Sequence, residues 1–179
     1  MPDTTPVYAL RFQEVGDAPN GPALGEDLAT DVEAEIIRLD ALIAALTARP
    51  LMGQALCTTQ LDLTTSDVDV PGATVTIVTT KPNAKYRVDG SFYMSAVTGG
   101  TGVATGKLAI DGVNQTANAN WTGVDTVARG TPAQAWQGTL AAAGSHVFKL
   151  RASQSAVGGG NGAFRVNTTG TAIAVMVFE

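Results

Sequence analysis

The stretch GEDLATDVEAEIIRLDALIAALTARP (residues 25–50) decides the architecture that the rest of the sequence implies. Its apolar residues recur at alternating spacings of three and four, which is the period of an amphipathic helix. Acidic residues open the stretch, as the positive end of a helix dipole favours, and Pro50 closes it because proline cannot continue the hydrogen-bond ladder. We therefore predict one long helix, which spans about 36 Å at about 1.5 Å per residue.

The apolar positions of this helix form a heptad seam. Its two core positions are filled by Ala29, Ile36 and Ile43 and by Val32, Leu39 and Leu46. Three heptads favour a coiled coil, although an amphipathic helix packed on the chain's own sheet would show a similar pattern. Leu28, Ile37 and Leu42 widen the apolar stripe, which favours three helices over two. The seam residues are therefore our predicted interface of a homotrimer.

After the helix, from residue 54, the apolar period changes to two. Seven segments read as strands: 54–63, 73–80, 85–97, 103–113, 133–142, 146–155 and 171–178. Gly, Pro and Asn separate them, and short strands with turns at this spacing predict a β-sandwich or jelly roll. The last strand is apolar on both faces, with Ile173 and Val175 on one and Ala174 and Met176 on the other. Its second face is expected to meet another subunit.

The residues before the helix have no core of their own. Val7–Phe12 could form a short strand, and residues 16–25 hold two Pro and three Gly in ten positions, which should break any regular element. The predicted organisation is an anchoring arm (residues 1–24), a trimerising helix as a stalk (25–50) and a β-sandwich head domain (51–179). The arm is expected to dock onto another protein.

Composition excludes several classes of function. The chain has a net charge of −5, and its 11 basic residues are scattered singly, which argues against a nucleic-acid partner. It shows no signal peptide and no apolar run of about 20 residues, so we expect synthesis in a cytoplasm and no membrane insertion. With one cysteine (Cys57) and one histidine (His146), a Cys/His zinc site cannot form within the chain. No cofactor or metal is predicted.

No catalytic constellation is evident. His146 has no carboxylate near it in the sequence, so a packed or solvated strand histidine is favoured over a general base. Asp67 and Asp69 would face one side of a strand, but two carboxylates fall short of the six or more oxygens that calcium takes. The glycine runs 99–102 and 158–160 lack the Lys-Ser/Thr of a phosphate-binding loop. We predict that the protein is not an enzyme.

One segment suggests ligand binding. Residues 111–125 read as a long polar connection that contains a tryptophan. Trp121 could offer a flat ring to a sugar face, and Asn118, Asn120 and Asp125 could bind its hydroxyls. Packing of Trp121 against a neighbouring strand or subunit is the alternative. These four residues are the candidate glycan-binding site.

Both ends of the chain resemble phage proteins. The segment YALRFQEVGDAPNGPALGEDLATDVEAEIIRLD (residues 8–40) resembles the attachment region of tail-associated and head-fibre proteins of bacteriophages that infect high-GC hosts. The segment GTLAAAGSHVFKLRASQSAVGGGNGAFRVNTTGTAIAVMVFE (residues 138–179) resembles the closing strands of their β-sandwich domains.

This resemblance implies a virion structural protein, specifically a homotrimeric short fibre or minor tail protein. The arm, residues 1–24, would bind other virion proteins, and the jelly roll would face outward, in a trimer layout like that of tumour necrosis factor or C1q. A head fibre or capsid decoration protein is one alternative. A carbohydrate-binding adsorption module for a host-surface glycan is another.

Overall fold

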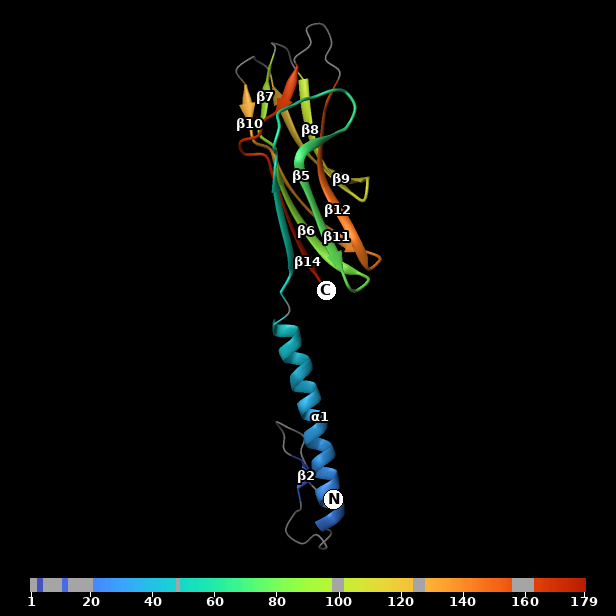
Figure 1. Ribbon diagram of the computed structural model, residues 1–179. Coiled ribbons are helices and arrows are strands. Elements are labelled where there is room, and N and C mark those ends of the chain that lie inside the picture. Colours follow the sequence, from blue (N-terminus) through green and yellow to red (C-terminus); the bar gives the residue numbers. More distant parts are fainter. Residues whose placement is uncertain are drawn as a thin grey trace. The chain divides into compact units, whose positions relative to one another are not determined.

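The structure is a computed structural model that describes residues 3–4, 11–12, 21–47, 49–97, 102–123, 128–155 and 163–179. The chain divides into two compact units, Met1–Ala48 and Arg49–Glu179. Figure 1 shows a helix in the first unit and a layered β structure in the second. The mainly β architecture with one helix, predicted from the change of apolar period, is confirmed.

The helix of the first unit, α1 (Gly21–Thr47), has 27 residues. It begins before the predicted start, so the expectation that residues 16–25 break any regular element is wrong from Gly21 onward. Pro22 is tolerated because the first N–H groups of a helix have no partner within it, and proline has no N–H to lose. In the arm, β1 (Asp3–Thr4) pairs with β2 (Arg11–Phe12) in antiparallel register. Val7–Leu10, the rest of the predicted first strand, lie outside the described residues.

The second unit is a sandwich of antiparallel sheets. One layer contains, in spatial order, β11 (Ala133–Leu140), β6 (Ala84–Ser91), β14 (Ala172–Phe178) and β3 (Leu51–Leu56). The opposing layer contains β5 (Val68–Thr79), β12 (Gly144–Gln154), β8 (Gly102–Ile110) and β9 (Val113–Gly123). Strands adjacent in space come from distant parts of the sequence, as in a jelly roll.

A third, small sheet continues the first layer. Its strands are β10 (Arg129–Gly130), β7 (Met94–Ala96), β13 (Phe164–Val166) and β4 (Leu61–Asp62). Each is the chain neighbour of one strand of the first layer, in the same spatial order. At the break between the two sheets lies the fully buried Thr171, whose hydroxyl accepts a hydrogen bond from the Tyr93 N–H at 2.8 Å. Figure 1 shows β7 and β10 at the end of this unit away from the C-terminus.

The core follows from period-two burial. Phe92, Phe148, Phe164, Leu108 and Leu150 have no exposed surface and lie between the layers. Burial of aromatic and aliphatic side chains on this scale is the main favourable term in folding. The alternation along each strand therefore explains why these segments form a sandwich.

The outer face of the first layer carries exposed apolar side chains on β3 and β14. Along β14, Ile173, Val175 and Val177 are buried, whereas Phe178 is 49% exposed on the other face. Next to it on β3, Met52 is 71% and Leu56 67% exposed. The last strand therefore presents apolar side chains on both faces, as its sequence indicates.

Cys57 is buried, and burial raises the pKa of its thiol, which donates a hydrogen bond to the Thr59 carbonyl at 3.1 Å. Since the thiolate is the reactive species, we expect Cys57 to react with a disulfide reagent at least about tenfold more slowly in the folded protein than in the denatured chain. Spectrophotometric thiol titration with and without denaturant measures both rates. Equal rates would contradict the burial.

Candidate functional site

The predicted trimer seam is exposed along α1. Within the single chain, Val32 is 39%, Ile36 52%, Leu39 43% and Ile43 56% exposed. Ala29 is exposed as well, and the side chain of Leu46 lies outside the described residues. The residues that widen the stripe are also exposed: Leu28, Ile37 and Leu42. A continuous apolar stripe of this kind is a surface that an interaction partner normally covers.

The structure separates the candidate glycan residues. Residues 113–123, read from the sequence as part of a connection, form the strand β9. Trp121 is half-buried and packs edge-on against Phe164, with ring centroids 5.6 Å apart and planes at 86°. Because successive side chains of a strand point to opposite faces, Asn118 and Asn120 are exposed on the other face.

The predicted platform with amides beside it is therefore corrected to a tryptophan packed against the sandwich. In a strand, the odd-numbered Trp121 and the even-numbered Asn118 and Asn120 must point to opposite faces. The sequence could have predicted this separation only if residues 113–123 had been recognised as a strand. Asp125 lies outside the described residues.

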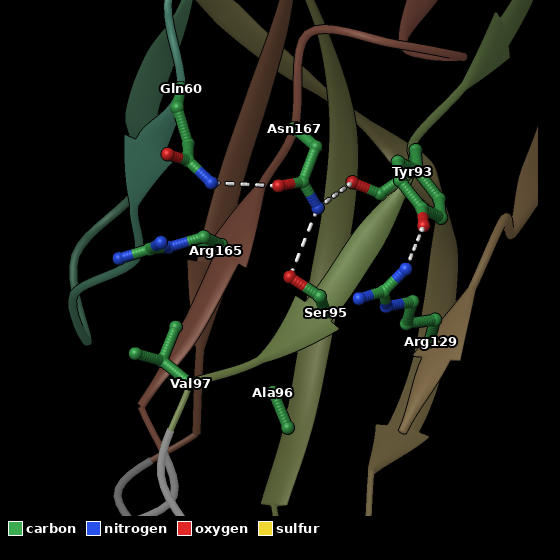
Figure 2. Close-up of a pocket in the computed structure, with 8 residues that line it drawn as sticks. All are labelled: Gln60, Tyr93, Ser95, Ala96, Val97, Arg129, Arg165 and Asn167. Carbon is green, nitrogen blue, oxygen red and sulfur yellow. Dashed lines mark hydrogen bonds between the residues drawn. The ribbon is translucent and has the colours of Figure 1, made fainter. Parts of the chain in front are cut away.

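A polar pocket of about 400 Å³ lies on the outer face of the small sheet (Figure 2). All four strands of that sheet or the residues beside them contribute polar side chains: Gln60, Tyr93, Ser95, Arg129, Arg165 and Asn167. The strand register places Arg129 and Arg165 each directly opposite Ser95, from its two sides. The pocket thus has a serine between two arginines in one cross-strand row.

Hydrogen bonds fix the floor of this pocket. The amide of Asn167 donates to the Ser95 hydroxyl at 3.0 Å and to the Tyr93 carbonyl at 3.3 Å, and accepts from the Gln60 amide at 2.8 Å. Figure 2 shows these bonds converging on Asn167 between the two arginines. The floor is therefore pre-organised by the protein itself.

The two arginines have different partners. The Arg165 Nε donates to Asp62 at 2.9 Å, which orients its guanidinium. Arg129 reaches the Tyr93 hydroxyl only at 3.5 Å, a weak contact, and makes no ion pair with any residue that the structure describes. Sequence reasoning missed this pocket because the arginines are 36 residues apart and become neighbours only through strand register.

The paired carboxylates of β5 and the preceding turn are neutralised by cations of the protein. Lys107 lies 2.8 Å from Asp67, and Lys149 lies 2.8 Å from Asp69. These hydrogen bonds hold the pKa of both carboxyl groups below the usual value. Among the described residues, no group of three or more His, Cys, Asp and Glu side chains is placed to hold a metal ion.

His146 does have a carboxylate partner, contributed by a distant part of the chain. Asp111 lies in the two-residue turn between β8 and β9, where it and Gly112 both have positive φ, as a tight hairpin requires. Its carboxylate contacts His146 Nδ1 at 2.8 Å, and the Ala142 carbonyl lies 3.1 Å from Nε2. Both ring nitrogens face acceptors, so the charged imidazolium suits this setting, and the Asp111 hydrogen bond raises the pKa of His146.

This pair predicts a pH dependence of stability. A histidine whose pKa is raised by folding stabilises the protein fully below its unfolded pKa of about 6.5, and that contribution disappears as pH rises through the folded pKa. We expect the free energy of unfolding to fall as the pH rises above about 6.5, and Asp111→Asn to reduce that slope. As His146 is the one histidine of the chain, its ring-proton NMR titration measures the pKa directly. A midpoint at or below about 6.5 would contradict the pairing.

Similar folds occur in several solved structures. A chain of the T13 infectious bursal disease virus particle is 12% identical at a TM-score of 0.50, covering 73% of this chain and 31% of that one. Eiger TNF from S. frugiperda is 10% identical at a TM-score of 0.46, covering 73% of this chain and 94% of that one. The CBM36-1 domain of a multidomain xylanase from the hindgut metagenome of Trinervitermes trinervoides is 9% identical at a TM-score of 0.33, covering 70% of this chain and 96% of that one.

The viral particle chain with a TM-score of 0.50 shares the β-sandwich fold with this chain. The solved structures include viral particle chains, TNF-family proteins and carbohydrate-binding modules, all similar to this chain in its β-sandwich. The match spans about a third of the length of the viral chains. Neither a protein-family model nor a curated protein sequence matches the chain. Within the described residues, no helix is long and apolar enough to cross a bilayer.

Proposed function

We propose that the protein is a virion structural protein that assembles as a homotrimer through the seam of α1. The observation that carries this proposal is the exposed apolar stripe, in which Ile36 is 52% and Ile43 56% exposed within one chain. Wide seams of this kind favour three helices, in which each apolar side chain is covered by its two counterparts. The fold of the second unit, which viral particle chains share, is consistent with a structural role.

The sandwich supplies a second surface for self-association. Met52, Leu56 and Phe178 are exposed on the outer face of the first layer, where Met52 lies opposite Met176 in the β3–β14 register. Three sandwiches could cover this face in the same assembly that the helices hold together. The trimer would then have two contact regions, one in each unit.

In this proposal the arm, residues 1–24, attaches the trimer to other virion proteins, and the sandwich is displayed. The protein would be a short fibre or minor tail protein of a phage, with a capsid head fibre or decoration protein as the alternative within the same class. Host-surface attachment through a glycan is a second candidate role, which the polar pocket of the small sheet favours. The proposal includes no catalytic activity.

Labelling of intact particles tests the proposal. An antibody raised against residues 51–179 and detected by gold electron microscopy should decorate purified particles of the phage that encodes this chain. Label at the tail would favour the fibre or minor tail protein, and label on the capsid the head fibre. Particles that lack the chain by both labelling and peptide mass spectrometry would overturn the virion role.

A further inference from the structure

We propose that the pocket of the small sheet binds the carboxylate of an acidic saccharide between Arg129 and Arg165. This inference deepens the candidate attachment role and rests on it. It assigns a ligand class and a position that differ from the tryptophan platform predicted from the sequence.

The cross-strand row provides the first argument. Ser95 lies between Arg129 and Arg165 in register, and adjacent strands are about 4.8 Å apart, so the two arginine backbones are separated by only two strand spacings. Arg165 is paired with Asp62 and Arg129 lies beside the Tyr93 hydroxyl, so an anion held above Ser95 would have a guanidinium group on each side. The short serine side chain leaves room above it, where the pocket of about 400 Å³ opens.

The distribution of charge provides the second. Residues 49–179 carry nine Lys and Arg against seven Asp and Glu, a formal charge of +2, whereas residues 1–48 carry two against nine, a formal charge of −7. The net charge of −5 therefore arises from the first unit, and the sandwich has a small positive formal charge. Most of its arginines and lysines with a described partner contact a carboxylate, but Arg129 contacts the Tyr93 hydroxyl. Of the two cations in the pocket, Arg129 is therefore the one that forms no ion pair with a described residue.

The other lining groups favour a saccharide over a simple anion. Besides the arginines, the pocket presents the Ser95 and Tyr93 hydroxyls and the Gln60 amide, which can both donate and accept hydrogen bonds. A ligand with several hydroxyls can use these groups together, and a volume of this size holds one or two sugar rings. The bonds that fix Asn167 keep the surface in place before a ligand arrives, which lowers the entropy cost of binding.

The place of the pocket agrees with a role in attachment. It lies on the small sheet, whose strands β7 and β10 are at the end of the sandwich away from the C-terminus (Figure 1). A ligand at this end would not compete with the apolar outer face of β3 and β14. Binding and self-association could therefore proceed together.

Titration of the full-length protein with trigalacturonic acid tests the inference. Isothermal calorimetry measures Kd, and the arginine Nε–H resonances report the site. Arg129→Gln is the cleaner variant because, among the described residues, it removes only the 3.5 Å contact with Tyr93, whereas Arg165→Gln breaks an ion pair. Arg87→Gln is the control, because it removes the same charge from the neighbouring β6 and, since it also breaks the ion pair with Asp89, disturbs the protein more than Arg129→Gln does. We expect Arg129→Gln to raise Kd at least about tenfold and Arg87→Gln to leave it unchanged.

Further probes separate the alternatives. Maltotriose should bind at least about tenfold more weakly than trigalacturonic acid, and so should inorganic sulfate. If maltotriose bound as tightly as trigalacturonic acid, the proposed role of the ligand's carboxylate would be wrong. If sulfate bound as tightly as trigalacturonic acid, the proposed role of the sugar hydroxyls would be wrong. Binding of glycerol 3-phosphate with none of trigalacturonic acid, or equal losses in Arg129→Gln and Arg87→Gln, would overturn the inference. None of these results would change where the chain is found on particles, so the virion role is tested independently.

Discussion

Replacing Ile36 with aspartate is expected to convert the assembled protein to monomers at micromolar concentration. In a three-helix seam the substitution would place three carboxylates close together in an apolar environment. The effective cost of burying an unpaired charge is several kcal/mol for each chain, and we expect this cost to outweigh the packing of the seam. Size-exclusion chromatography with light scattering measures the mass of the variant and of the parent chain.

The matched control is Ala34→Asp, which adds the same charge two residues away, where the side chain points to the other side of the helix. It should keep the mass of the parent. The fluorescence of Trp121 and Trp136, which both lie in the sandwich, should be unchanged in both variants, because the hydrophobic core of the described residues contains no residue of the first unit. If the assembly survived Ile36→Asp, the contact between subunits would have to be the apolar outer face of β3 and β14 instead of the seam.

The second large effect concerns the sandwich core. Phe148 has no exposed surface and contacts the ring of Tyr86 edge-on, with centroids 5.8 Å apart. Phe148→Ala removes most of a large aromatic from a close-packed core, and we expect it to lower the free energy of unfolding by about 3–5 kcal/mol. Urea unfolding followed by tryptophan fluorescence measures this loss.

Val78→Ala is the control for this prediction, because Val78 lies on the neighbouring strand β5 with 63% exposure. It should cost less than about 1 kcal/mol. All variants must be compared at one protein concentration, since the stability of an oligomer depends on it. Similar losses for Phe148→Ala and Val78→Ala would contradict the assignment of Phe148 to the core.

The parts of the structure that sequence reasoning predicted are those with a strong local period. The apolar spacing of residues 25–46 predicts a helix, and the alternation in residues 171–178 predicts the last strand; both are present. The start of the helix was missed because Pro22 reads as a breaker except in the first turn. Residues 113–123 were missed as a strand because Asn and Ala replace the β-branched residues that usually mark one.

The candidate site was less accessible to sequence reasoning, for a physical reason. The seam of α1 is a property of one helix, so its residues can be read in order. Arg129, Ser95 and Arg165 come from three strands, and only the pairing of β10, β7 and β13 places them in one row. Asp111 and His146 are likewise 35 residues apart and meet at a hairpin. Sites of this kind depend on register, which composition and spacing do not contain.

The most direct test of the account is the native mass of the unmodified full-length chain, measured by mass spectrometry under non-denaturing conditions. Assembly through the seam of α1 predicts three times the chain mass of 18.3 kDa, with dissociation of that species in Ile36→Asp. A single species of 18.3 kDa at micromolar concentration would contradict the trimer and, with it, the proposed fibre.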